Sequence, residues 1–370
     1  MNSHPVRAVP SLALPSPTEI RSLDITHRRR IRERVVRERI NHFEKWDYKE
    51  FFQRFRLSKG TVENLIEELD NVLRHPTERN SAVSPTDQIL LALRFYATGS
   101  FLQTVGDFSG VHATTAGKII HKVSVALAAL RNITIKMPST DEERLECKRK
   151  FYNIARFPMC IGAIDCSHIK IISPGGETAE AFRNRKQFFS LNVQTICDSN
   201  LKIMDIVPRW PGSAHDSHIF RNSSVMTRFE SGEFGDNCVL VGDSGYPCKS
   251  YLLTPLAQTR TRAENLYSEA QIRTRNPVER SYGVWKRRFP GLAMGLRTNL
   301  KTTQVIITAT AVLHNIACDE REDEPWVNAD EQRAIDLVNN NPPDVDDIRN
   351  NRHDNNFFRQ QLINNYFNNL

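Results

Sequence analysis

The 370-residue sequence has few of the features that mark membrane, secreted or zinc-ribbon proteins. No apolar run approaches the roughly 18–20 residues that a membrane-spanning helix needs. Prolines interrupt the first 17 residues, which hold no continuous apolar block of the kind found in secretory signals. The seven cysteines are scattered and none forms a C-x-x-C pair, which disfavours a disulfide framework and a zinc ribbon. The simplest reading is a globular protein with reduced thiols in the cytosol or nucleus.

Basic residues outnumber acidic ones, and the charge is unevenly distributed along the chain. The net charge is +7, yet residues 319–370 hold 5 basic and 12 acidic side chains. The remainder of the chain therefore carries a net charge of +14. A basic body favours a polyanionic partner, with nucleic acid as the leading candidate. Charge alone leaves open the alternative of a basic protein that binds no nucleic acid.

The N-terminal third is expected to be flexible at residues 1–20 and helical over about 21–135. Arg28–Arg39 forms a basic run, which fits nuclear import, phosphate contact or simply a solvated helix face. A short helix, a turn at Ser109-Gly110 and a longer helix have the spacing of a helix-turn-helix, over about 84–130. Lys118 and Lys122 on the longer helix would then contact DNA. An ordinary antiparallel helix pair has the same pattern.

The chain changes character after Lys148 and becomes rich in short apolar runs of strand composition. We expect an antiparallel meander, then a helix, a buried strand, two helices divided at Asn276-Pro277, and a final apolar helix. In order, these elements lie at 161–172, 188–198, 201–210, 215–230, 238–243, 264–275, 277–289 and 302–318. This order predicts an α/β fold over about 148–318, preceded by an all-α region. The acidic, Asn-rich tail, 319–370, is expected to be poorly ordered, with a short helix or docking segment at 357–367.

Three acidic residues stand out in the α/β part. Asp165 lies inside the first apolar strand, Asp243 ends the fourth strand, and Glu279 lies on the helix that follows. Carboxylates in apolar strands are unfavourable unless they are paired, protonated or bound to metal, and two ionised neighbours repel each other. Mg²⁺ or Mn²⁺ prefers such oxygen ligands, and a pair of ions suits phosphodiester hydrolysis. For each acid alone, the alternative is a helix cap or a buried ion pair.

The segment around Glu279 supports this interpretation. Val278, Tyr282, Trp285 and Phe289 form one apolar stripe, and Glu279 lies at its border. A basic group next to the acid would contact phosphates, although a solvated basic helix end has the same composition. The residues predicted to contact DNA here are Arg280, Lys286, Arg287 and Arg288.

Four blocks in this order and spacing resemble the DDE superfamily endonuclease domain of PIF/Harbinger transposases and of the nucleases derived from them. They are GAIDCSHIKI, WPGSAHDSHIF, GDSGYP and NPVERSYGVWKRRF, and LRFYATGSFLQTVGDFSGVHATTAGKIIHKVSVAL upstream resembles the family's helix-turn-helix region. The resemblance covers about residues 50–318. It implies an RNase H-like mixed sheet with flanking helices and a divalent metal. By position, Asp165, Asp243 and Glu279 match the family's catalytic triad, and Asp216 matches a further acid and metal ligand.

The resemblance also implies DNA as substrate, a separate Myb/SANT-like DNA-binding partner, and action in the nucleus, with cytoplasmic presence open. Cys166-Ser167 replaces the Gly-Thr or Ala-Thr that commonly follows the first acid. The sequence therefore predicts a transposase-derived, metal-dependent nuclease, with oligomerisation left open. Two alternatives remain: a domesticated DNA-binding or adaptor protein without turnover, and an active Harbinger transposase.

Overall fold

The computed structural model describes residues 39–75, 82–339 and 357–370. All of them belong to one unit, Glu38–Leu370. The expected flexible segment 1–20 and nearly all of the basic run 28–39 lie outside the described residues.

A five-stranded mixed sheet lies at the centre of the α/β part, with strand order β3-β2-β1-β4-β5. The strands are β1 (Cys160–Lys170), β2 (Ser190–Cys197), β3 (Ile203–Pro211), β4 (Val239–Val241) and β5 (Leu252–Leu253). The first three pair antiparallel, whereas β4 runs parallel to β1 and β5 runs parallel to β4. The meander expected from the sequence is therefore confirmed, as is the apolar fourth strand.

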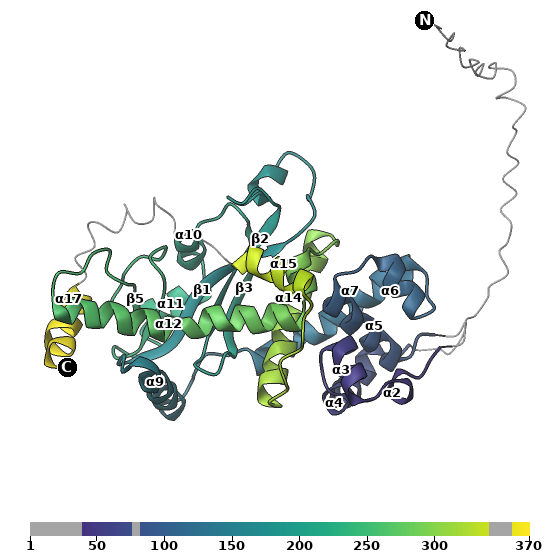
Figure 1. Ribbon diagram of the computed structural model, residues 1–370, viewed down its shortest axis with the longest axis horizontal. Helices are drawn as coiled ribbons and strands as arrows, with labels where there is room; N and C mark the ends of the chain where they lie inside the picture. The colour runs from purple at the N-terminus through teal and green to yellow at the C-terminus, as the bar shows by residue number, and fades with distance from the viewer. Residues whose placement is uncertain (1–38, 76–81, 340–356) are drawn as a thin grey trace, which may run out of the picture. The chain divides into compact units, whose positions relative to one another are not determined.

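Helices cover both faces of this sheet (Figure 1). The larger apolar cluster joins one sheet face to the helices α9 (Asp141–Ala155), α12 (Arg262–Arg288) and α14 (Leu300–Asp319). A second cluster joins the other face to α10 (Asp216–Arg221) and α11 (Ser224–Glu230). Because side chains alternate along a strand, residues of β1 contribute in turn to the two clusters. The α/β expectation is confirmed at this level.

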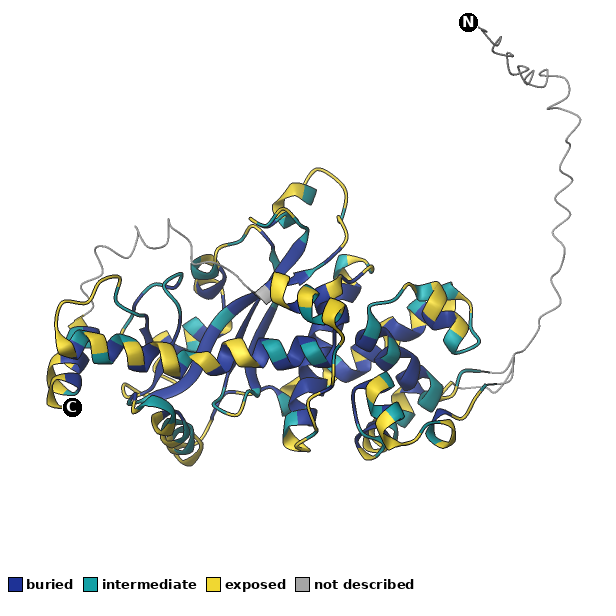
Figure 2. Ribbon diagram, in the orientation of Figure 1, coloured by how far each residue is buried: buried dark blue, intermediate teal, exposed yellow. Residues whose placement is uncertain are grey.

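The helix α12 is one continuous element of 27 residues, which corrects the expected division at Asn276-Pro277. Thr261 and Glu264 form a capping box at its start, where the Thr261 hydroxyl accepts from the N–H of Glu264 at 3.2 Å. Pro277 is buried inside the helix and lacks the N–H that would bond to the carbonyl four residues before it. Burial of the helix face against the sheet outweighs that lost bond (Figure 2).

The N-terminal part is all helical, as expected. It comprises α2 (His42–Lys45), α3 (Tyr48–Phe55), α4 (Lys59–Leu73), α5 (Pro85–Thr98), α6 (Leu102–Phe108), α7 (Ala113–Ala129) and α8 (Arg131–Thr134). The pair α6 and α7 has the spacing read as a helix-turn-helix, but α7 also packs against α5 and α14. These contacts are those of a helical bundle, so the helix-turn-helix stays a prediction.

Most of the described part of the acidic tail is folded, which differs from the expected poor order, whereas the short helix expected at 357–367 is confirmed. It contains α15 (Ala329–Asn339), α17 (Phe357–Asn365) and a short 3₁₀ helix, η3 (Phe367–Asn369). The buried ring of Phe367 lies 5.9 Å from that of Phe157 and 5.5 Å from that of Tyr267, centroid to centroid. Aromatic burial of this kind orders residues 357–370, which hold one charged side chain, Arg359.

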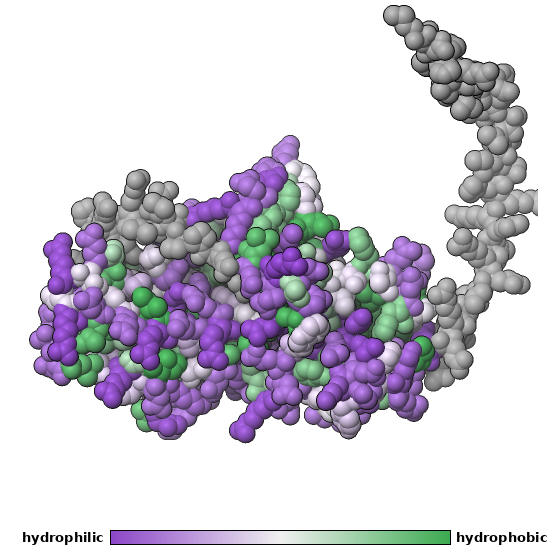
Figure 3. Space-filling view, viewed as in Figure 1, coloured by the Kyte–Doolittle hydropathy of each residue, from purple (hydrophilic) through white to green (hydrophobic). Residues whose placement is uncertain are grey.

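Hydrophilic side chains cover most of the visible face of the molecule, and apolar residues on it form small separate groups (Figure 3). Among the described residues, no helix is both long enough and apolar enough to cross a lipid bilayer.

Candidate metal centre

The backbone at Asp165 on β1 is held by contacts from β2 and from α12. It pairs across the sheet with Thr195 on β2. The hydroxyl of Tyr282, from α12, donates to the Asp165 carbonyl at 2.6 Å and accepts from the Thr195 hydroxyl at 2.9 Å. These bonds fix the backbone position from which the Asp165 carboxylate projects.

Asp243 reaches the same edge of the sheet because β1 and β4 are parallel neighbours. Ala163 pairs with Val241, and each acid follows two residues later, Asp165 within β1 and Asp243 just past the end of β4. The chain turns directly after β4, and the Gly245 N–H donates to the Asp243 carboxylate at 3.0 Å. Parallel pairing thus converts a separation of 78 residues in sequence into proximity in space.

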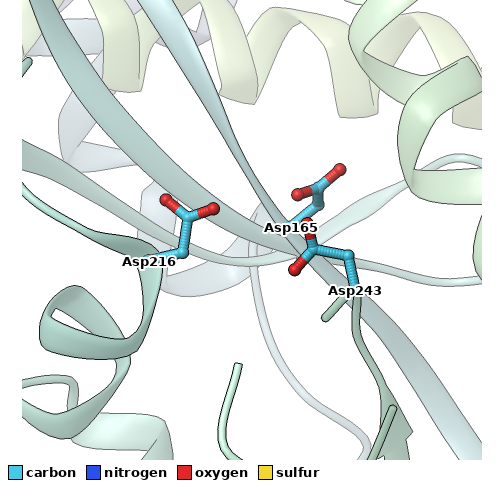
Figure 4. A group of neighbouring side chains, drawn as sticks. All are labelled: Asp165, Asp216 and Asp243. Carbon is cyan, nitrogen blue, oxygen red and sulfur yellow. The ribbon is translucent and has the colours of Figure 1, made fainter. Parts of the chain in front are cut away.

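Asp216 is the first residue of α10 and approaches from another element. Asn192 of β2 donates from Nδ2 to its carboxylate at 3.0 Å. Ligand oxygens of Asp165, Asp216 and Asp243 all lie within 4.8 Å of one another. Figure 4 shows the three side chains arriving from β1, from the start of α10 and from the segment after β4. The further acid suggested by the resemblance is therefore brought together with the two strand acids.

Burial and mutual repulsion act on these carboxyls in the same direction. Removal from water, followed by the charge of Asp243, raises the pKa of Asp165 well above its usual value. Burial likewise raises the pKa of Asp243. Arg275 opposes both shifts. A divalent cation removes this repulsion more completely, because it brings two positive charges to the cluster.

Glu279 lies outside the group of three aspartates. Its side chain is 53% exposed on α12, one helical turn after Arg275. Arg275 contacts Asp165 at 3.2 Å through Nη1 and Glu279 at 2.5 Å through Nη2. The structure therefore connects Glu279 to Asp165 through a guanidinium. Sequence reasoning missed Arg275, although its position four residues before Glu279 was a usable signal.

The donor set fits a hard divalent cation. The three aspartates offer carboxylate oxygens only, which Mg²⁺ and Mn²⁺ prefer. The buried Oδ1 of Asn192, whose Nδ2 bonds to Asp216, has no hydrogen-bond partner among the residues that the structure describes. An unpaired buried oxygen on the side chain that contacts Asp216 leaves an acceptor for a bound cation or water.

Four of the six residues predicted to contact DNA are not buried. Lys118 and Arg280 are exposed, and Lys122 is exposed while its ammonium donates to the Leu73 carbonyl at the end of α4. Arg287 forms an ion pair with Glu324 at 2.6 Å.

Lys286 and Arg288 do not belong to the expected basic surface patch, because both side chains are buried. The Lys286 ammonium donates to the Ser167 hydroxyl at 2.6 Å and to the His168 carbonyl at 3.1 Å. Arg288 donates to the Arg56 carbonyl at 2.7 Å. Consecutive residues on a helix point in different directions, so a run of basic residues cannot form one face.

A family model described as DDE superfamily endonuclease matches residues 164–315. A protein named Putative nuclease HARBI1 from Mus musculus is 36% identical over 262 residues, which cover 70% of this chain and 74% of that relative. The Homo sapiens protein of the same name is 33% identical over the same shares. Protein ALP1-like from Arabidopsis thaliana is 26% identical over 74% of this chain and 71% of the relative. No solved structure matches.

Proposed function

This chain belongs to the family of DDE superfamily endonucleases that includes the relatives named Putative nuclease HARBI1, and from that membership we propose that it hydrolyses DNA phosphodiester bonds with a divalent metal, Mg²⁺ or Mn²⁺. The family resemblance drawn from the sequence is thereby confirmed. The observation that carries the proposal is the convergence of three aspartates from distant parts of the chain within 4.8 Å.

Each side chain of the site has a distinct part in this proposal. Asp165, Asp216 and Asp243 would hold the cation, which supplies positive charge to activate water and to stabilise the leaving oxygen of the phosphodiester. Glu279 would complete the coordination and help align or activate the attacking water. Its exposure suits this role, because an attacking water must reach it from solvent.

The proposal also covers the fold of the chain and its contacts with DNA. A meander of three antiparallel strands with a fourth strand parallel to the first supports an RNase H-like arrangement. The exposed Lys118 and Arg280 are proposed to contact the DNA backbone. Action in the nucleus and a Myb/SANT-like partner complete the proposal.

The proposal is tested by nicking of supercoiled DNA by the full chain in Mg²⁺ or Mn²⁺. Asp243→Asn and Glu279→Gln should each abolish cleavage while the protein remains folded. Glu269→Gln is the matched control, since Glu269 is 68% exposed on α12 and pairs only loosely with Arg273 at 3.8 Å. Cleavage that persists in both site variants would refute the assignment.

The same preparation separates a nuclease from a binding protein without turnover. Wild-type protein that binds DNA and Mn²⁺ but leaves every substrate intact, including DNA ends with inverted repeats, would favour the adaptor alternative. Joining of the cleaved ends to a target DNA would instead identify an active transposase.

A further inference from the structure

Arg275 is a cationic side chain that contacts two acids of the proposed site. Its two terminal nitrogens contact different acids: Nη1 lies 3.2 Å from Asp165 Oδ2, and Nη2 lies 2.5 Å from Glu279 Oε1. It also acts electrostatically on Asp243. One guanidinium therefore joins an acid of β1 to the acid of α12 that the proposed mechanism requires.

The position of Arg275 is set by the helix and by burial. Residues four apart on a helix lie on one face, so Arg275 and Glu279 are neighbours on α12. The Arg275 and Asp165 side chains are 16% and 15% exposed, whereas that of Glu279 is 53% exposed. Arg275 thus lies on the interior side of the pair, and Glu279 lies on the solvent side.

Arg275 contacts carboxylates that the proposed metal site would also use. A carboxylate oxygen that accepts a charged hydrogen bond has less electron density to offer a metal, and two cations close to one carboxylate repel each other. Arg275 bound to both acids therefore offsets one of their negative charges before any divalent ion arrives. Its guanidinium lies between the Glu279 carboxylate and that of Asp165.

We propose that Arg275 is an internal counter-cation that competes with the divalent metal for Asp165 and Glu279. This inference rests on the proposed function and adds a control on the metal affinity of its site. Arg275 stabilises the acidic cluster without metal, and its release from Glu279 accompanies full loading. It is a positioning residue, because it acts through the acids.

Metal binding to the full chain tests the competition directly. In calorimetric titrations with Mn²⁺, Arg275→Gln should bind about tenfold more tightly than wild type, equivalent to about 1.4 kcal/mol. Arg273→Gln is the matched control, because Arg273 lies two residues away on α12, is 58% exposed and has only long contacts in the described residues, to Glu269 at 3.8 Å and to the Ile154 carbonyl at 3.4 Å. Its Mn²⁺ affinity should equal that of wild type. Arg275→Lys keeps the charge without the two-pronged contact and should fall between wild type and Arg275→Gln.

Thermal unfolding in EDTA tests the counter-cation role without metal. Arg275→Gln should lower the midpoint, and the double variant Asp165→Asn/Arg275→Gln should recover most of the loss, because it also removes one of the repelling carboxylates. A structural ion pair unrelated to the cluster would show no such recovery.

The outcomes separate the two proposals. Equal Mn²⁺ affinity of wild type and Arg275→Gln would overturn the competition and leave the nuclease proposal standing. Absence of Mn²⁺ binding in both proteins would overturn the proposed metal site together with the competition. Tighter binding by Arg275→Gln with recovery by Asp165→Asn would establish the inference.

Discussion

The hydroxyl of Tyr282 connects α12 to β1 and β2, and its removal by Tyr282→Phe is a sharp test of how Asp165 is held. The side chain is 4% exposed. Its hydroxyl donates to the Asp165 carbonyl at 2.6 Å and accepts from Thr195 at 2.9 Å. Asp165 and Thr195 are themselves a cross-strand pair of β1 and β2.

The expected loss follows from the groups left behind. Phenylalanine keeps the ring packing, so the change removes the two hydrogen bonds and creates little extra space. A buried group left without its partner costs about 1–3 kcal/mol, and the Thr195 hydroxyl can rotate toward another acceptor. We therefore expect Tyr282→Phe to lower the free energy of unfolding by about 1–3 kcal/mol.

Chemical denaturation of the full chain in EDTA measures this difference. Tyr48→Phe is the control, because Tyr48 is 75% exposed, and it should change stability by less than about 0.5 kcal/mol. Thr195→Val combined with Tyr282→Phe should lose less than the sum of the two single changes, since they share one hydrogen bond. Wild-type stability in Tyr282→Phe, or strict additivity in the double variant, would refute the reasoning.

Three other predictions concern acidity, packing and the tail. Because the folded-state pKa values of Asp165 and Asp243 are raised, the folded protein holds more protons than the unfolded one, so metal-free stability should fall as pH rises from the usual aspartate range through those values. Denaturation midpoints measured in EDTA across a pH series should show a flatter slope for Asp165→Asn, and an unchanged slope would contradict the shift. Gly162→Ala should destabilise by about 1–3 kcal/mol in urea unfolding, because a Cβ there would lie 2.7 Å from an Ile196 methyl group; a neutral effect would show that β2 yields easily. Phe367→Ala, at a side chain 2% exposed, should lower stability by about 3 kcal/mol, against little change for Phe357→Ala at 74% exposure; equal midpoints for the two would show that η3 does not support the core.

Much of the α/β part was predictable because its signals are local. The apolar runs of β1 to β4 indicate strands without any distant contact, and the short connection at Ser199-Asn200 indicates that β2 and β3 are antiparallel. Asp165 and Asp243 stand out because a carboxylate in an apolar strand requires compensation. The family resemblance then supplied Asp216, whose position at the start of α10 has no apolar strand around it to single it out.

The parts that were not predictable depend on contacts between distant residues. The burial of Lys286 against Ser167 cannot be read from a basic run, because composition does not show which side of a helix faces the sheet. Pro277 predicts a break by local rules, and tertiary burial of α12 overrides it. The packing of η3 depends on Phe367 meeting Phe157 and Tyr267, which lie 210 and 100 positions earlier in the sequence.

Because α12 is one continuous helix, the direction in which each of its site residues points depends on the number of residues that precede it on the helix. Tyr267 near its start packs on the tail, whereas Arg275, Glu279 and Tyr282 further along turn toward the acids and β1. One residue inserted between Tyr267 and Arg275 would rotate all three by about 100° and shift them by about 1.5 Å. The stretch between Tyr267 and Tyr282 should therefore tolerate substitutions at its exposed positions but no change in length. A gain or loss of a residue there would dismantle the site even with every acid retained.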